Sequence, residues 1–162
     1  MEKVFEKTRQ LLQKSQSCMM VTVLEKKGSG PRGTGARMVL TEEGLLEGTV
    51  GGGSMEQQAV IDGIEGLRKK TSFIREYSLD NIQAGKAGMI CGGRMSLYFQ
   101  YISGEDEKTK RQFSLLFQAL EGDEKSWMIL DITKPSFWKL EILKENSKAG
   151  KLPQGLKDEL SG

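Results

Sequence analysis

One cysteine of the sequence stands where its sulfur could do chemistry. Cys91 is followed by Gly92 and Gly93, and paired glycines beside a thiol leave more space around the sulfur than a core position would. Neighbouring Lys86 or Arg94 would favour the thiolate, which is the form that binds metals or attacks electrophiles. Because one cysteine cannot complete a protein zinc site, a metal held here would bring most of its own ligands.

Three consecutive glycines form a second candidate site. Gly51, Gly52 and Gly53 end a predicted strand and run directly into Ser54, which is expected to cap a helix, with Gln57 completing a capping box. Glycine lets the backbone approach a ligand closely, and a helix start offers unpaired amides and partial positive charge to an anion. The alternative is a tight turn without a ligand. Glu56 then either pairs with the helix dipole or directs its carboxylate at a ligand.

A glycine-rich segment over residues 28–35 is the third candidate. It contains a literal G-x-G-x-x-G match, but strand-like residues 36–40 follow it where a dinucleotide site needs a helix, and it lacks the lysine of a phosphate-binding P-loop. What remains is an open loop that carries Arg32 and offers backbone N–H groups and a guanidinium to an anion. The alternative is a hairpin loop without a ligand.

Composition excludes several classes of function. The chain has no histidine, which removes Ser-His-Asp and Cys-His catalysis and histidine metal ligation. With 24 basic and 22 acidic residues, its net charge of +2 does not indicate a nucleic-acid partner. The longest apolar run, residues 18–24, is too short to cross a membrane, and the start of the chain is too charged for a signal peptide, so we expect a cytoplasmic protein. Cys18 lies in this apolar run and is expected to be unreactive core packing.

The elements that must position these groups follow from hydrophobic periodicity and turn residues. Helices are predicted over residues 4–12, from residue 54, and around residues 113–120, and strands at residues 18–26, 37–40, 45–50, 73–79, 94–101, 127–132 and 137–143. We expect one α/β domain with a mixed β-sheet, flanking helices and glycine-rich connecting loops. Residues 1–103 form the module that carries the candidate sites, residues 104–143 extend the same domain with a helix and a hairpin, and residues 144–162 are a polar tail.

Taken together, three segments resemble the XdhC/CoxI family of xanthine dehydrogenase accessory factors. They are residues 28–38 (GSGPRGTGARM), 51–56 (GGGSME) and 88–93 (GMICGG), and the resemblance covers about residues 8–102. It implies a chaperone rather than a catalyst. Such a protein binds molybdenum cofactor (molybdopterin), supports replacement of a terminal oxo ligand by sulfur, and passes the cofactor to a molybdenum hydroxylase apo-enzyme.

The resemblance also assigns roles to residues and partners. Cys91 would face the molybdenum, and its companions in the cofactor site would be Arg32, Gly51, Gly52, Gly53, Ser54, Glu56, Gly92 and Gly93. A cysteine desulfurase would be a further partner, and the protein would form a homo-oligomer. Two alternatives stay open: a sulfur carrier that transfers a persulfide from Cys91, and an interaction module that binds the hydroxylase without the cofactor.

The sequence departs from the family pattern at three places. Longer members carry a C-terminal Rossmann-like domain, for which nothing after Gly104 offers a glycine fingerprint. Ser54 stands where members often have a cysteine, and Ser96 stands where they often have a glutamate. The chain therefore resembles the amino-terminal module with a short extension.

Overall fold

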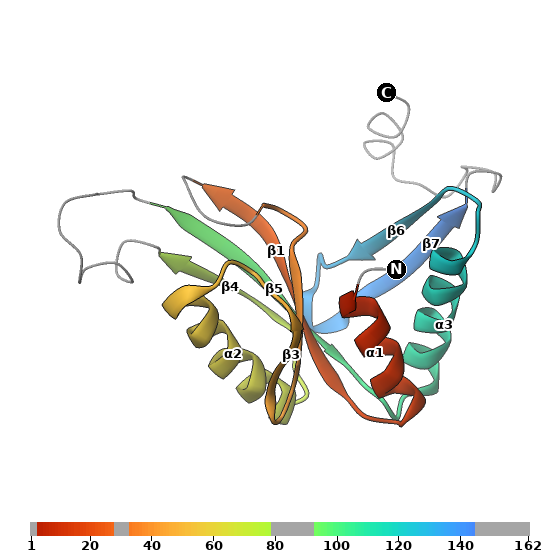
Figure 1. Cartoon of the computed structure of the whole chain (residues 1–162), viewed down its shortest axis with the longest axis horizontal. Coiled ribbons are helices and arrows are strands. Elements are labelled where there is room, and N and C mark those ends of the chain that lie inside the picture. The colour runs from red at the N-terminus through yellow and green to blue at the C-terminus, as the bar shows by residue number, and fades with distance from the viewer. Residues whose placement is uncertain (1–2, 28–32, 79–92, 145–162) are drawn as a thin grey trace.

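A twisted antiparallel sheet organises the molecule (Figure 1). The computed structural model describes residues 3–27, 33–78 and 93–144. Its five-stranded sheet has the order β3-β2-β1-β5-β4, and a two-stranded sheet pairs β6 with β7. The elements are α1 (Lys3–Gln13), β1 (Cys18–Lys27), β2 (Arg37–Thr41), β3 (Gly44–Gly48), α2 (Gly53–Arg68), β4 (Phe73–Ser78), β5 (Arg94–Ile102), α3 (Glu107–Glu121), β6 (Ser126–Asp131), the 3₁₀ turn η1 (Pro135–Phe137) and β7 (Lys139–Lys144).

The central strand β1 is buried on both faces, as its apolar run predicts. It pairs with β2 on one side and with β5 on the other. Met19, Val21 and Val23 lie in the core cluster under α2, whereas Cys18 and Met20 lie in the cluster on the opposite face. Because successive strand residues point to opposite faces, one short apolar run supplies both halves of the core.

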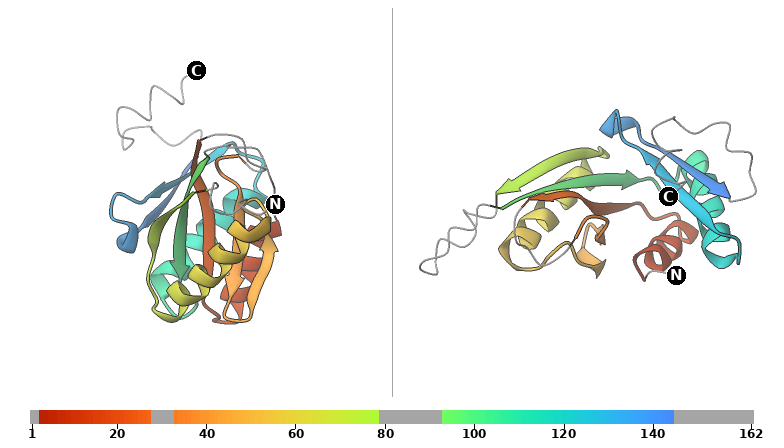
Figure 2. Two further views of the ribbon diagram at one scale, coloured as in Figure 1. Left: turned by 90° about the vertical axis from the view of Figure 1, so that its left-hand side faces the viewer. Right: turned by 90° about the horizontal axis from the view of Figure 1, so that it is seen from above.

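Each face of the sheet is covered by different elements. The α2 side chains Met55, Ala59 and Leu67 are buried against one face, and Ile64, which the helical spacing groups with them, is half-buried. On the other face, buried residues of α1 and α3 pack together with Leu140 of the β6–β7 hairpin. Seen from above, α2 lies toward one end of the molecule and α1 and α3 lie toward the other (Figure 2).

The predicted elements after residue 104 are confirmed with two local differences. β7 begins at Lys139 rather than at residue 137, because Pro135 to Phe137 form a short 3₁₀ turn, and Phe137 is 79% exposed. Leu120 is also exposed although its spacing places it with the buried residues of α3, which end at Phe117.

The α/β class, the single domain and the flanking helices are confirmed, and every strand pairing among the described residues is antiparallel. None of the helices in these parts of the chain is long and apolar enough to span a membrane.

Candidate functional site

The described flanks of the three candidate segments lie at one end of the sheet. Lys27, the last residue of β1, pairs with Arg94, the first residue of β5, and Ser78 at the end of β4 pairs with the same Arg94. Gly93 is buried just before this pair. Figures 1 and 2 show the start of α2 on the same side of the molecule as this end of β1, β4 and β5. We call it the glycine end of the sheet.

The structure describes only part of the predicted site. Cys91, Gly92 and Arg32 lie outside the described residues, as do residues 145–162 of the polar tail. The backbone that leads to them is described on at least one side, at Lys27, Gly33 and Gly93. The run from Gly51 to Glu56 is described in full, so the geometry of the site is clearest there.

The carboxylate of Glu56 organises the glycine turn, Gly51–Gly53. Its Oε2 accepts a hydrogen bond from the Thr49 hydroxyl at 2.5 Å and from the backbone N–H groups of Val50, Gly51 and Gly52 at 2.9, 3.3 and 3.0 Å. Four donors therefore converge on one oxygen of the chain itself. The sequence leaves two roles open for Glu56: pairing with the helix dipole, or directing its carboxylate at a ligand. In the structure this oxygen is instead bound by donors of the protein's own turn.

The predicted capping box is wrong. The helix begins at Gly53, its N-cap is Gly52 without a side-chain hydrogen bond, and Ser54 and Gln57 are exposed. The reason is backbone geometry: φ is +150° at Gly51, +75° at Gly52 and +68° at Gly53, values that favour glycine. This left-handed path folds the N–H groups of Val50, Gly51 and Gly52 toward the Glu56 carboxylate, which stabilises the turn before the helix, while the first N–H groups of α2 are left without a side-chain cap.

Burial and hydrogen bonding oppose each other at Glu56. Partial burial raises the pKa of Glu56, but the hydrogen bonds from Thr49, Gly52, Val50 and Gly51 lower it by more, so that it falls below its usual value. The turn therefore holds a carboxylate, not a carboxylic acid, at neutral pH. The sequence gives one signal for this arrangement that was missed, because the hydroxyl of Thr49 stands directly after β3 and only seven residues before Glu56.

The outer side of the glycine turn is open. A Cβ atom placed on Gly52 or Gly53 would meet no other atom within 4 Å. The N–H groups of Gly53, Ser54 and Met55 in the first turn of α2 have no acceptor among the described residues. These amides and the partial positive charge of the helix start make this surface complementary to an anion.

A second polar cluster, also missed at the sequence level, ties α2 to β4. Asp62 is 5% exposed and accepts hydrogen bonds from the Tyr77 hydroxyl at 2.5 Å and the Gln58 amide at 3.1 Å, and it pairs with Arg75 at 2.6 Å. Burial raises the pKa of Asp62, and the bonds from Tyr77, Arg75 and Gln58 lower it by more, to below its usual value. Burial and then the Asp62 carboxylate raise the pKa of Tyr77. The available signal was the spacing of Arg75 and Tyr77, which places both on one side of β4.

Cys18 is packed as predicted. It is wholly buried, and this burial raises the pKa of its thiol to about 12, so the thiolate does not form near neutral pH. Within residues 3–27, 33–78 and 93–144, no cluster of three or more His, Cys, Asp or Glu side chains is arranged to hold a metal ion.

Comparisons with known proteins match the sequence motifs and the fold. Residues 11–78 match the model of the XdhC and CoxI family. The chain is 25% identical over 95 residues to the uncharacterized protein YqeB of Escherichia coli strain K12, an alignment that covers 59% of this chain and 17% of YqeB. A solved structure from Bacillus halodurans, described as a xanthine dehydrogenase, is 24% identical with a TM-score of 0.62, over 86% of this chain and 41% of that one. The chain thus spans less than half the length of either relative, and the structural likeness establishes the fold.

Proposed function

Residues 11–78 of this chain belong to the XdhC and CoxI family, and from this we propose that the protein is an accessory chaperone for a molybdenum hydroxylase. It binds molybdenum cofactor as cargo, assists its sulfuration, and hands it to the apo-enzyme. The client is an enzyme of the xanthine dehydrogenase type, a choice supported by the description of the Bacillus halodurans relative.

The observation that carries this proposal is the common position of the described residues that flank or belong to the three candidate segments. The sequence separates the three segments by tens of residues. The antiparallel pairing of β1, β5 and β4 brings the described flanks of the first and third to the glycine end of the sheet, and the start of α2, which carries the second, lies on the same side of the molecule (Figure 1). A cofactor with a phosphate at one end and a metal at the other needs contacts from separate parts of a chain. Convergence of these flanks supports one binding site over three unrelated turns.

We assign the phosphate of the cargo to the open side of the glycine turn. Gly52 and Gly53 leave space there, and the N–H groups of the first turn of α2 can donate hydrogen bonds to an anion on this side. Ser54 is exposed in the same turn and can add its hydroxyl, and Arg32 can add a guanidinium. Glu56 acts as a positioning residue, because its Oε2 is already bound by four donors of the turn.

Cys91 would face the molybdenum, with Gly92 and Gly93 giving the metal centre room to approach. Cys18 cannot share this role, because its thiol is fully buried in the core. A cysteine desulfurase would supply the sulfur, and the exchange would take place in the cytoplasm between a homo-oligomer of this protein and its client.

Anaerobic purification with molybdenum and pterin analysis tests the proposal. The wild-type protein should carry both, Cys91→Ala should lose most of the bound cofactor, and the matched control Cys18→Ala should keep it. Full cofactor content in Cys91→Ala would remove the thiol from the mechanism. The absence of pterin from anaerobic wild-type protein that still binds the hydroxylase would replace the chaperone with an interaction module.

The sulfur-carrier alternative is separated by mass spectrometry. After incubation with a cysteine desulfurase and cysteine, a carrier gains the mass of sulfur on Cys91, whereas a chaperone that only holds the cofactor gains none.

A further inference from the structure

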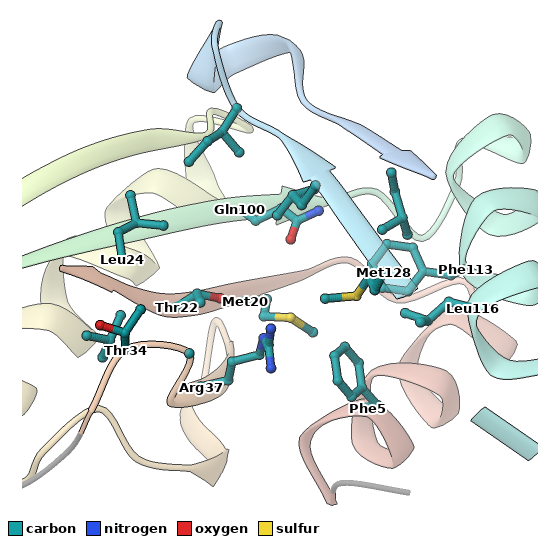
Figure 3. A pocket seen from close by; sticks show the side chains of 15 residues that line it. Phe5, Met20, Thr22, Leu24, Thr34, Arg37, Gln100, Phe113, Leu116 and Met128 are labelled. Atoms are coloured by element: carbon teal, nitrogen blue, oxygen red, sulfur yellow. The ribbon is translucent and has the colours of Figure 1, made fainter. Parts of the chain in front are cut away.

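The free polar groups of the main sheet lie at its outer edge rather than in its interior. A cavity of about 240 Å³ between the sheet, α1, α3 and the β6–β7 hairpin is lined mostly by apolar side chains, with Gln100 of β5 among them (Figure 3). No buried side-chain nitrogen or oxygen of the described residues lacks a hydrogen-bond partner, so this cavity gives no sign of a ligand. β4 differs, because it is the last strand of the five-stranded sheet and pairs only with β5 among the described strands.

One hydrogen bond shows which backbone groups of β5 point toward β4. In an antiparallel strand, the N–H and C=O of one residue point to the same side, and those of the next residue point to the other side. The Tyr101 N–H donates at 2.8 Å to Oγ of Ser72, the residue directly before β4. The alternate residues Phe99 and Leu97 therefore also direct their N–H and C=O groups toward β4.

Ile74 and Glu76 of β4 point theirs away from the sheet. Phe73 and Arg75 stand opposite Phe99 and Leu97, so their backbone groups face β5, and those of the residues that alternate with them face outward. The carbonyl before the strand follows the same alternation, because it accepts a hydroxyl of η1 at 3.1 Å. Within the described part of the chain, no group bonds to the backbone N–H or C=O of Ile74 or Glu76.

The opposite edge of the sheet is protected, and the β4 edge is not. β3 has only five residues, its register with β2 shifts at a bulge, and α1 lies against it. β4 pairs with β5 over six consecutive residues without a shift and contains no proline. Because a regular, open edge strand is a template for a further strand, β4 is the edge of this sheet that is suited to a partner.

The exposed side chains at this edge indicate the chemistry of the partner. Ile74 is 41% exposed, and Phe137 of η1 is 79% exposed. η1 lies against β4, and Figure 2 shows the β6–β7 connection beside the start of this strand. Glu76 lies on the same face as Ile74, is exposed, and makes no ion pair with another described residue. Arg75, on the other face, is already paired with Asp62.

We propose that the free edge of β4 binds an extended segment of a partner protein as an added antiparallel strand. The segment carries a basic residue opposite Glu76 and, two residues later, an apolar residue opposite Ile74. Its backbone pairs with the outward N–H and C=O groups of these two residues, and opposite charges directly across the pair add to the affinity. The segment ends at η1, where Phe137 extends the apolar contact.

A second copy of the chain does not match this edge. Only two antiparallel registers pair both Ile74 and Glu76 with residues of β4 from another copy. One register sets two Arg75 side chains directly opposite each other, and the other does the same with two Glu76 side chains, so each brings like charges together. Residues 145–162 do not supply the segment either, because no basic residue there stands two positions before a large apolar residue.

The added strand would run beside β4 from the glycine end, at Ser78, to η1. If the partner is the client of the proposed chaperone, its bound segment lies next to the cargo site, and this position rests on the proposed function. Binding at the edge does not rest on it, because the outward groups of β4 are independent of any cargo.

Binding of a labelled peptide to the full chain tests the proposal. The fluorescein-labelled peptide TVTKTITV has its lysine two residues before its isoleucine, and its fluorescence anisotropy should rise on binding. Two matched peptides should bind about tenfold more weakly: TVTETITV, which sets a glutamate opposite Glu76, and TVTKTITV N-methylated at the isoleucine, which cannot donate to the Ile74 carbonyl. Absence of binding, or equal affinity of either matched peptide, overturns the proposal.

A charge reversal separates strand addition from unspecific attraction. Glu76 is exposed, so Glu76→Lys should fold as wild type does, which its melting temperature checks. The variant should lose affinity for TVTKTITV and gain affinity for TVTETITV, each by a factor of about ten. Glu141→Lys makes the same change at an exposed position of β7 and should bind both peptides as wild type does. A preference that Glu76→Lys does not reverse overturns the proposal.

Amide hydrogen exchange locates the bound peptide. In the free chain, the N–H groups of Ile74 and Glu76 should exchange faster than those of Phe73 and Arg75, which face β5. The peptide should slow exchange at Ile74 and Glu76 and leave residues 45–47 of β3 unchanged. Slow exchange of both amides in dilute free protein would assign the edge to the chain itself, and slowing that follows protein concentration alone would assign it to a second copy. Either result overturns the proposal.

These outcomes are separable from those of the proposed function. A protein that binds none of the peptides but whose cofactor content depends on Cys91 refutes only the strand addition. Peptide binding in a protein that never carries cofactor refutes only the chaperone role.

Discussion

The Glu56 carboxylate gives the sharpest stability prediction at the candidate site. Glu56→Gln keeps the shape of the side chain but replaces a charged acceptor with a neutral one. In the wild type, one oxygen receives the Thr49 hydroxyl and three backbone N–H groups at 2.5–3.3 Å. The variant therefore weakens four contacts at once without leaving a cavity.

The size of the effect follows from the strength of each contact. A hydrogen bond to a charged group contributes about 1.5–3 kcal/mol and a neutral one about 0.5–1.5 kcal/mol. Because the turn is partly exposed and one contact is long, we expect a total loss of about 1–2 kcal/mol rather than the sum over four bonds. For a chain of this size that corresponds to a melting temperature lower by about 2–8 °C.

The pH dependence of the difference isolates the carboxylate. The pKa of Glu56 is lowered in the folded protein, so its stabilisation is fully present above the unfolded value of about 4.3 and is lost as the pH falls through the folded value. Thermal unfolding of wild type and Glu56→Gln should differ by a constant amount between about pH 5 and 7, and the difference should shrink as the pH falls below the unfolded value of about 4.3 toward the lowered folded value.

The matched control is Glu65→Gln, which removes an exposed carboxylate from the same helix and should leave the melting temperature near that of the wild type. Equal stability of Glu56→Gln and wild type at pH 7 would refute the four-donor turn. A difference that persists undiminished to about pH 3 would show that something other than charge is lost.

Three further predictions concern the fold. Gly48→Ala should lower the free energy of unfolding by at least about 2 kcal/mol, because φ is +87° and the new Cβ would lie 2.3 Å from the Arg37 carbonyl oxygen; a urea titration equal to that of the wild type would contradict this. Asp62→Asn should lower the free energy of unfolding by about 1–3 kcal/mol, because the Tyr77 hydroxyl loses a charged acceptor. Calorimetry that shows the same stability as wild type would mean that the Asp62 cluster does not stabilise the contact between α2 and β4. In Cys91→Ser protein, Cys18 should resist iodoacetamide at pH 8 until urea unfolds the chain, since burial raises its thiol pKa to about 12; rapid labelling of native protein would show that the strand opens.

Local periodicity was sufficient to predict most elements, because it reports directly on burial. The apolar run over residues 18–24 predicts an interior strand, and β1 is buried on both faces and paired on both sides. The Thr41–Gly44 turn predicts a hairpin, and β2 and β3 form it. Where a pattern depends only on neighbours in the chain, the sequence was enough.

Features set by non-local geometry could not be predicted in this way. The capping box at Ser54 satisfies the local rule, but the positive φ angles of three glycines fold the preceding turn onto Glu56 and leave the helix without a side-chain cap. Gln100 has no sequence signal, because its burial depends on a helix and a hairpin that pack over β5 from later in the chain. Convergence at the glycine end likewise depends on strand order, which hydrophobic spacing does not encode.

Hydrogen–deuterium exchange with and without molybdenum cofactor, under anaerobic conditions, tests most directly whether the glycine end of the sheet is the cargo site. The account predicts slower exchange at residues 33–35, 51–56 and 93–95 when cofactor is added, with residues 41–44, 69–72 and 103–106 at the opposite end unchanged. Protection confined to the opposite end, or no protection at any of these segments in protein that demonstrably holds the cofactor, would contradict it.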